Sequence, residues 1–196
     1  MKIICISGKA RHGKTITAGI LKDILEAHNR RVLVTNYADL LKYICKTFFN
    51  WGGEKDEHGR HLLQYIGTDV VRKQRPTYWV DFIISILRMF PHDWDYVIIP
   101  DCRFPNEIEL LDNKFKDEVT HLRIVRPNFE SDLTEEQKEH PSETALDNVT
   151  PDYTFYNVGT LEVYEGYVRA VAPLTIFKEE TYAKANSVSD SEEIGS

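Results

Sequence analysis

The sequence is poor in sulfur, with three cysteines and two methionines among 196 residues. Cys5, Cys45 and Cys102 stand far apart, and no C-x-x-C or paired His/Cys spacing accompanies them, which argues against a zinc site. We therefore expect free thiols in the core and a reducing, cytoplasmic compartment, that of the host cell if the chain is phage-encoded. No apolar run approaches the length of a membrane span, and we expect no leader peptide and no membrane partner.

An excess of positive charge is also lacking. The chain carries 24 Lys and Arg against 31 Asp and Glu, a net charge of −7, which argues against a nucleic-acid polymer as the main partner. A small phosphate ligand is not excluded, because it needs only a local basic cluster. With 42% hydrophobic residues, the chain can form the core of a single α/β domain.

The segment Gly8–Thr15 reads GKARHGKT and matches the phosphate-binding pattern G-x-x-x-x-G-K-[ST]. An apolar strand is expected before it at Lys2–Ser7 and an amphipathic helix after it at Thr15–His28. In that setting backbone N–H groups and a helix N-terminus surround a phosphate, and a chance glycine-rich turn is the alternative. We assign the nucleotide to the loop residues Gly8, Lys9, Ala10, Arg11, His12, Gly13, Lys14 and Thr15, with Lys14 on the phosphates and Thr15 on Mg²⁺.

Strands and helices alternate along the rest of the chain. This order predicts an α/β fold in three layers, with a parallel five-stranded sheet and helices on both faces. The further strands are expected at Arg31–Asn36, Trp94–Pro100, Val119–Val125 and Tyr153–Val158. The further helices are expected at Ala38–Phe49, Leu62–Arg72, Tyr78–Met89, Asn106–Phe115 and Leu161–Val171, with a charged loop at Glu54–His61.

Several signatures of other phosphate-loop proteins are missing. The N-K-x-D pattern of GTPases is absent, since Asn113-Lys114 is followed by Phe115-Lys116, and the transporter ATPase signature is absent too. The chain is also short for a motor ATPase. A compact kinase remains, organised as one domain over 1–182: a core (1–37, 92–126 and 148–182), a helical acceptor-binding insertion at about 38–91, a lid at about 127–147, and a disordered tail over 183–196.

Four segments, GKARHGKT (8–15), LLQYIGTDVVR (62–72), DCRFPNE (101–107) and HPSETALD (140–147), resemble the bacteriophage deoxynucleoside monophosphate kinases. A weaker fifth is DYTFYNVGTLE (152–162). The resemblance implies a P-loop kinase fold with ATP and Mg²⁺ as cofactors. It implies transfer of the γ-phosphoryl of ATP to a deoxynucleoside monophosphate, which supplies DNA precursors. The implied partners are these small nucleotides, and a homodimer is left open.

Phosphoryl transfer needs positive charge and alignment more than covalent chemistry. Asp101 follows a buried strand, so its carboxylate is expected near the loop and is assigned to Mg²⁺, with a cap for the helix Asn106–Phe115 as the alternative. Arg103 is assigned to the acceptor phosphate or to the transferring phosphoryl group, and a surface ion pair is the alternative. Arg72, ranked above Arg75, is assigned to the acceptor phosphate. The alternative for both arginines is a solvated position at the end of a helix.

The acceptor base requires a flat apolar slot with a few polar contacts. For stacking and edge contacts the sequence offers Tyr65, Tyr78, Trp79, Phe82, Gln64 and Asp69, although aromatics at helical spacing are more often core residues. Asp39 could contact the sugar or base, or cap the helix that it begins. On the family motifs we add Glu107 and Glu143 to the acceptor site and Asn157 to the nucleotide site.

The expected lid is polar and acidic, and it has no arginine after Arg126. Arg126, with Arg123, would have to supply its positive charge. His12 is expected to shape the loop or touch adenine, because an anionic acceptor oxygen needs no general base. Ser142 is expected to begin a helix, and His140 has no role that its chemistry alone assigns.

Two other functions share some of these features. Animal-type phosphomevalonate kinases have a similar layout, with a downstream S-E-x-x-L-D stretch, and a non-catalytic nucleotide-binding module could keep the loop as a sensor. The aromatic insertion favours a nucleotide acceptor, and the combination of Lys14, Thr15, Asp101 and Arg103 favours catalysis.

Overall fold

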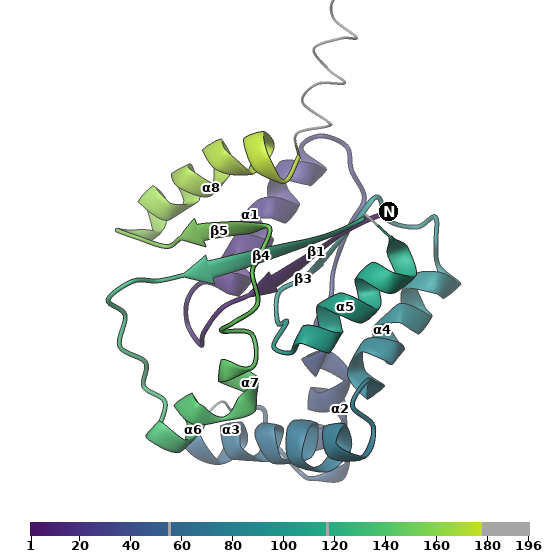
Figure 1. Cartoon of the computed structure of the whole chain (residues 1–196), viewed down its shortest axis with the longest axis vertical. Coiled ribbons are helices and arrows are strands. Elements are labelled where there is room, and N and C mark those ends of the chain that lie inside the picture. The colour runs from purple at the N-terminus through teal and green to yellow at the C-terminus, as the bar shows by residue number, and fades with distance from the viewer. Residues whose placement is uncertain (55, 117, 178–196) are drawn as a thin grey trace, which may run out of the picture.

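The structure is a computed structural model, and it describes residues 1–54, 56–116 and 118–177. Five parallel strands form one sheet in the order β2-β3-β1-β4-β5 (Figure 1). Their bounds are β1 (Lys2–Ser7), β2 (Val32–Val34), β3 (Tyr96–Ile99), β4 (Val119–Val125) and β5 (Tyr153–Tyr156). The predicted three-layer α/β fold with a five-stranded parallel sheet is confirmed, and the predicted tail lies outside the described residues.

The central strand β1 is buried on both faces, and its side chains alternate between two cores. Ile3 and Cys5 belong to one core, and Ile4 and Ile6 belong to the other. A near-continuous apolar run is what a parallel strand covered by helices on both sides requires. The three cysteines are free and buried, as predicted.

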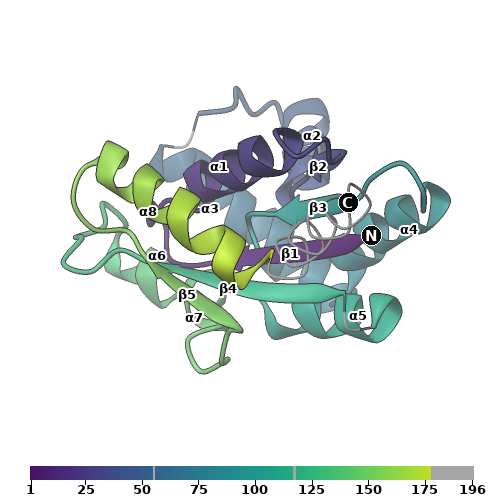
Figure 2. The ribbon, with the colours of Figure 1, turned by 90° about the horizontal axis from the view of Figure 1, so that it is seen from above.

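One face of the sheet is covered by α1 (Lys14–Glu26) and α8 (Leu161–Thr175), which lie side by side in both views (Figures 1 and 2). The helix α1 buries Leu21 and Leu25 at helical spacing against this face. Tyr164 and Val168 do the same for α8. The core of this layer holds the phosphate-binding loop to the sheet, because α1 begins directly after the loop.

The opposite face is covered by α5 (Pro105–Phe115), α4 (Tyr78–Met89) and α2 (Ala38–Phe48) (Figure 1). Below them, in the view of Figure 1, lie α3 (Glu57–Gln64) and the π-helix η1 (Tyr65–Arg72). The short helices α6 (Glu135–Glu139) and α7 (Pro141–Thr144) lie beside α3 and follow β4 along the chain. The helices from α2 to α4 form the predicted insertion between β2 and β3.

The insertion contains two departures from the predicted helices. The loop expected at Glu54–His61 is wrong in its second half, because α3 begins at Glu57. Asp56 caps that helix by accepting the Gly59 N–H at 2.7 Å. The ordinary helix expected at Leu62–Arg72 continues α3 and becomes a π-helix from Tyr65. Hydrophobic spacing does not distinguish these two helix types over eight residues.

Most other boundaries differ by only a few residues. The strand Val119–Val125 and the helix Tyr78–Met89 have the predicted bounds, whereas β2 covers only the middle of Arg31–Asn36. Within the described parts of the chain, none of the helices has the length and apolar character needed to cross a bilayer.

Candidate active site

The phosphate-binding loop depends on two glycines that hold left-handed backbone angles. Gly8 has φ +142°, and a Cβ there would lie 2.4 Å from the Ile124 carbonyl oxygen of β4. Gly13 has φ +107°, and a Cβ there would meet the Asn157 amide at 2.6 Å. The loop therefore packs against β4 and the end of β5 so closely that only glycine fits at these positions.

Side chains behind the loop fix its shape. Asn157 donates to the His12 carbonyl at 2.9 Å, so the predicted nucleotide residue supports the loop from behind. The buried Thr17 hydroxyl lies 3.0 Å from the Gly13 carbonyl and 2.6 Å from the Tyr164 hydroxyl, which ties α8 to the start of α1. His12 shapes the loop as well, because its Nδ1 accepts the Arg126 N–H at 3.2 Å.

Lys14 lies inside the loop that it is predicted to serve. Its ammonium donates to the carbonyls of Gly8 at 2.6 Å and Lys9 at 2.8 Å. Burial, together with the positive charge of Arg103, lowers the pKa of Lys14 to about 8. Thr15 follows with an exposed side chain at the start of α1.

Asp101 caps a helix, although a different one from the helix considered in the sequence. One carboxylate oxygen accepts the Tyr37 N–H and the other accepts the Ala38 N–H, both at 2.9 Å, so Asp101 caps α2 rather than α5. Burial raises its pKa. Its charge favours the charged form of Lys14 and so opposes the effect of burial on the Lys14 pKa.

Arg103 connects the loop to the segment that contains α7. Its guanidinium donates to the Glu143 carboxylate and, at 2.9 Å, to the Ser142 carbonyl. The other Glu143 oxygen accepts the Ala10 N–H of the loop at 3.1 Å. Although burial opposes ionisation, Arg103 holds the pKa of Glu143 below its usual value. For Arg103, we gave an ion pair as the alternative to a catalytic role. Arg103 does form an ion pair, and that ion pair lies at the loop.

Arg72 and Glu107 form a buried ion pair beside Arg103. The Arg72 Nη2 lies 2.5 Å from a Glu107 oxygen, and the two side chains are 12% and 2% exposed. The second Glu107 oxygen accepts the backbone N–H of Arg103 at 2.7 Å and that of Phe104 at 3.1 Å. Burial raises the pKa of Glu107, although Arg72 opposes this shift. Arg72 is thus not a solvated helix end, and it also stacks on the Phe104 ring at 3.9 Å.

The segment after β4 is held to the loop by further charges. Lys9 donates to the Glu143 carbonyl at 2.6 Å and to Asp147 at 2.7 Å, and Arg11 pairs with Asp132 at 2.7 Å. Arg126 points its guanidinium over the Phe129 ring, 4.4 Å from the ring centre. Arg123 instead holds the backbone after α7, with a donation to the Val149 carbonyl at 2.8 Å.

The residues proposed for the acceptor base are divided between a surface cavity and the core. Gln64, Tyr65 and Asp69 line a cavity of about 550 Å³ between α3–η1 and α6–α7. Trp79 is buried in the core, and its indole N–H donates to the Gly67 carbonyl at 3.0 Å. Trp79 therefore has the core packing role that we gave as the alternative to stacking on a base.

Four further candidates lie elsewhere on the insertion. Asp39 accepts the Asn36 N–H at 3.1 Å and pairs with Lys42 at 2.8 Å, at the start of α2. Arg75 lies over the Tyr78 ring at 5.3 Å, and Phe82 is exposed on α4. For these residues the structure records local contacts only.

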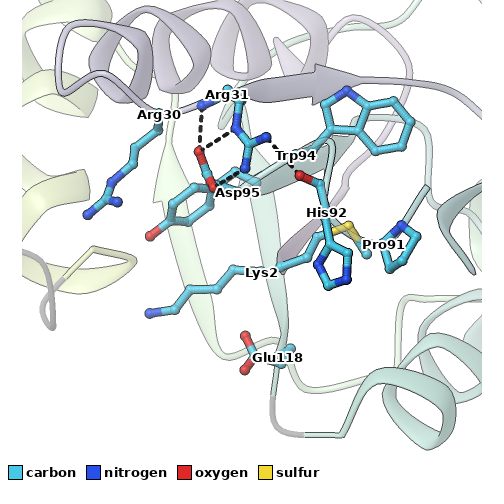
Figure 3. Close-up of a pocket in the computed structure, with 10 residues that line it drawn as sticks. Lys2, Arg30, Arg31, Pro91, His92, Trp94, Asp95 and Glu118 are labelled. Carbon is cyan, nitrogen blue, oxygen red and sulfur yellow. Dashed lines mark hydrogen bonds and ion pairs between the residues drawn. The ribbon is translucent and has the colours of Figure 1, made fainter.

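A second cavity, of about 400 Å³, lies at the end of the sheet where the strands begin, opposite the loop (Figure 3). It surrounds the start of β1, where Arg31 donates to Asp95 at 2.9 Å and to the His92 carbonyl at 2.7 Å. None of the predicted site residues lines it. The two cavities share no lining residue, and of the two only the 550 Å³ cavity is lined by predicted site residues.

Several contributors were not identified from the sequence. Tyr164 and Asp132 form contacts whose partners lie far away in the chain, so no local pattern marks them, whereas Asn106 lies in the quoted segment DCRFPNE. His121 is buried beneath the loop, where its Nε2 lies 2.7 Å from the Ser7 hydroxyl. Asp147 lies in the quoted segment HPSETALD, which is a signal that could have identified it.

The described residues contain no cluster of three or more His, Cys, Asp or Glu side chains that could hold a metal ion by themselves. Mg²⁺ that binds together with a nucleotide keeps several waters and takes few protein ligands besides phosphate oxygens. Thr15 and Asp101 offer a hydroxyl and a carboxylate near the loop, and each Asp101 oxygen retains a lone pair after accepting its N–H.

Comparison with known sequences now adds to this geometry. A family model described as Deoxynucleotide monophosphate kinase matches residues 42–167, more than half of the chain. The match begins after the phosphate-binding loop, so it is independent of that motif. The deoxynucleotide monophosphate kinase of Enterobacteria phage T4 is 33% identical over 105 residues, which are 53% of this chain and 40% of that protein. The match thus spans about two fifths of the relative's length.

Solved structures support the fold. A sugar kinase from Janibacter sp. HTCC2649 aligns with a TM-score of 0.51 and 13% identity over 90% of this chain and 94% of that chain. An APS kinase from Mycobacterium tuberculosis, in complex with AMPPNP and APS, aligns at 0.47 and 10% identity over 88% of this chain and 96% of its own. The similarity to the sugar kinase concerns the fold alone. The TM-score of the APS kinase is too low to support a conclusion.

Proposed function

Because this chain belongs to the deoxynucleotide monophosphate kinase family, we propose that it transfers the γ-phosphoryl of ATP to a deoxynucleoside 5′-monophosphate. The products would be ADP and the deoxynucleoside diphosphate, a DNA precursor. Residues 38–91 and the segment 127–147 would enclose the acceptor, and the loop would hold ATP.

One observation carries the proposal: a continuous set of contacts joins the loop to the arginines of the acceptor side. Glu143 accepts the Ala10 N–H of the loop and pairs with Arg103. Arg103 and Arg72 in turn share Glu107, which pairs with the Arg72 side chain and accepts the Arg103 N–H. Both arginines are thereby fixed relative to the loop, as they must be where two phosphates approach each other.

On the donor side, the backbone supplies most of the binding. The loop amides and the N-terminus of α1 surround the phosphates, and Lys14 turns from the Gly8 and Lys9 carbonyls to the β- and γ-oxygens. A phosphate also favours the charged form of Lys14 and so opposes the effect of burial on its pKa.

On the acceptor side, arginines supply most of the binding. Arg72 is held in place by Glu107, Asn106 and the Phe104 ring, and its Nε has no partner among the described residues. A guanidinium that is already fixed loses little freedom when it binds a phosphate. Arg103 lies between Arg72 and Lys14 and is placed to contact the transferring group. The attacking phosphate oxygen is anionic, so the site needs no general base.

Mg²⁺, held by Thr15 and by Asp101 through water, would neutralise charge on the phosphates of ATP. The capping of α2 by Asp101 also fixes the start of the insertion relative to β3. The same carboxylate thus links the metal position to the acceptor-binding part of the chain.

The test is an ADP-release assay with ATP and Mg²⁺ and a panel of deoxynucleoside monophosphates, ribonucleoside monophosphates and phosphomevalonate. We expect ADP release with at least one deoxynucleoside monophosphate, and none above background for the Lys14→Ala variant. Release with phosphomevalonate alone, or no acceptor-dependent release from protein that binds ATP, would overturn the proposal.

A further inference from the structure

The cavity between α3–η1 and α6–α7 contains a histidine that the proposed reaction leaves without a role. The cavity measures about 550 Å³. Gln64, Tyr65 and Asp69 form one wall, and Gln137 and His140 belong to the other. His140 follows α6 and is the N-cap of α7, so it belongs to the segment whose Glu143 accepts the Ala10 N–H of the loop.

The contacts of His140 determine where its proton is. The Ser142 backbone N–H donates to His140 Nδ1 at 3.2 Å, which makes Nδ1 the acceptor and leaves the hydrogen on Nε2. Burial lowers the pKa of His140, which keeps the ring neutral. Nε2 is itself buried and has no hydrogen-bond partner among the described residues. An unpaired buried donor is costly, so its position beside a cavity indicates a ligand that accepts from it.

Asp69 supplies the complementary group across the cavity. Its Oδ2 lies 4.0 Å from His140 Nε2, while its Oδ1 pairs with Lys73 at 3.1 Å. Beside it on η1, Tyr65 is 51% exposed and stacks on His61 with an interplanar angle of 2°. A flat ring, an N–H donor and a carboxylate acceptor thus share one cavity.

The two walls have the same internal arrangement. On η1, Asp69 precedes Arg72 by three residues, and on the opposite wall His140 precedes Glu143, the partner of Arg103, by three residues. Each wall therefore has one residue that lines the cavity, Asp69 or His140, and one residue that belongs to the proposed phosphate site, Arg72 or Glu143. A mononucleotide with its phosphate at Arg72 and Arg103 would extend its base towards Asp69 and His140.

We propose that His140 and Asp69 recognise the Watson–Crick edge of the acceptor base and select guanine. This inference rests on the proposed kinase function. The pair offers one N–H donor and a carboxylate with two acceptor oxygens, and its complement has one acceptor and two donors. Guanine presents this set with O6, N1–H and N2–H. Thymine has O4 and N3–H but no second donor, and adenine and cytosine would place a ring nitrogen lone pair where guanine and thymine carry the N–H that donates to the carboxylate.

The test compares kcat/KM for dGMP, dTMP, dCMP and dAMP at saturating ATP. The wild-type chain is expected to prefer dGMP. Asp69→Asn should lower kcat/KM for dGMP about 10- to 100-fold and change that for dAMP much less, since a well-formed pair to a base edge discriminates by roughly this factor. The KM for ATP should stay unchanged.

A second variant separates recognition from folding. His140→Asn keeps a side-chain oxygen that can cap α7 at Ser142 but removes the Nε2–H, so the thermal midpoint should change little while the dGMP preference falls. Glu139→Gln, an exposed change at the neighbouring residue, is the matched control and should leave all four values unchanged.

The outcomes distinguish the two proposals. No turnover with any nucleotide would refute the kinase function itself. Turnover with a preference for dCMP or dAMP, or with base ratios that neither Asp69→Asn nor His140→Asn alters, would overturn the guanine inference and leave the kinase function standing.

Discussion

The proposed donor side and the proposed acceptor side of this site differ in whether backbone or side chains form them. The donor side consists of backbone, one loop of eight residues whose two glycines allow close approach to β4 and β5. The acceptor side consists of long side chains from η1, α5 and α7, fixed by the pairs Arg72–Glu107 and Arg103–Glu143. A backbone site tolerates the loss of one side chain without unfolding, whereas a site made of buried ion pairs does not.

Lys14→Ala should produce the largest loss of activity with little loss of stability. Removing a charge that clamps the transferring phosphate costs on the order of 3–5 kcal/mol in the transition state, a fall in kcat of about 10²- to 10³-fold or more. The measurement is kcat together with the thermal midpoint, with Lys22→Ala, a surface change on α1, as control. Near-normal turnover in Lys14→Ala would remove the loop from the mechanism.

Arg72→Ala should reduce both activity and stability, in contrast to Lys14→Ala. It leaves the Glu107 carboxylate, 2% exposed, without its charged partner, which costs about 3–5 kcal/mol of unfolding free energy. The KM for the monophosphate should rise much more than the KM for ATP. The double variant Arg72→Met, Glu107→Gln should recover most of the stability but not the KM. Equal changes in both KM values would place the acceptor phosphate elsewhere.

A buried histidine beneath the donor side, His121, makes stability depend on pH. Burial, with the charge of Arg123, lowers the pKa of His121 to about 4, from an ordinary value near 6.5. The neutral ring is favoured by folding, so its contribution is fully present above pH 6.5 and is lost as the pH falls towards 4, up to about 2–3 kcal/mol. Urea unfolding between pH 7.5 and 4.5 should show this loss, and His121→Gln should flatten it. An unchanged slope in that variant would contradict the assignment.

Asp101→Asn should lower stability by about 1–2 kcal/mol, less than the loss expected for Arg72→Ala. Asparagine has only one side-chain oxygen, so either the Tyr37 or the Ala38 N–H would face an NH₂ group instead of an acceptor. If Asp101 also serves Mg²⁺, the Mg²⁺ concentration for half-maximal activity should rise. A lower thermal midpoint with the same Mg²⁺ dependence would leave Asp101 as a cap alone.

The same contrast explains what the sequence could predict. The loop is contiguous, so its geometry, its strand and its helix follow from residues 2–28, and alternation of strands with helices gives the sheet. The acceptor side joins residues separated by 35 positions in Arg72–Glu107 and by 40 in Arg103–Glu143. Family motifs indicated these residues, but no local pattern indicates which acid pairs with which arginine.

The errors have physical causes of the same kind. The helix that Asp101 caps follows a different strand, so sequence proximity indicated α5 when the nearest free N–H groups belong to α2. In the π-helix that continues α3, Gly67 is buried against α2, where a Cβ would lie 2.7 Å from the Leu41 side chain. Such contacts exist only after the insertion has folded.

The contact between Glu143 and the Ala10 N–H has a thermodynamic consequence for nucleotide binding. An incoming phosphate that takes this N–H must displace a carboxylate, so binding is an exchange of one anion for another. The affinity for a nucleotide whose phosphate takes this N–H would then be a difference between two interactions with similar geometry. Because the displaced Glu143 also holds Arg103, the strength of donor binding and the freedom of the acceptor arginine vary together.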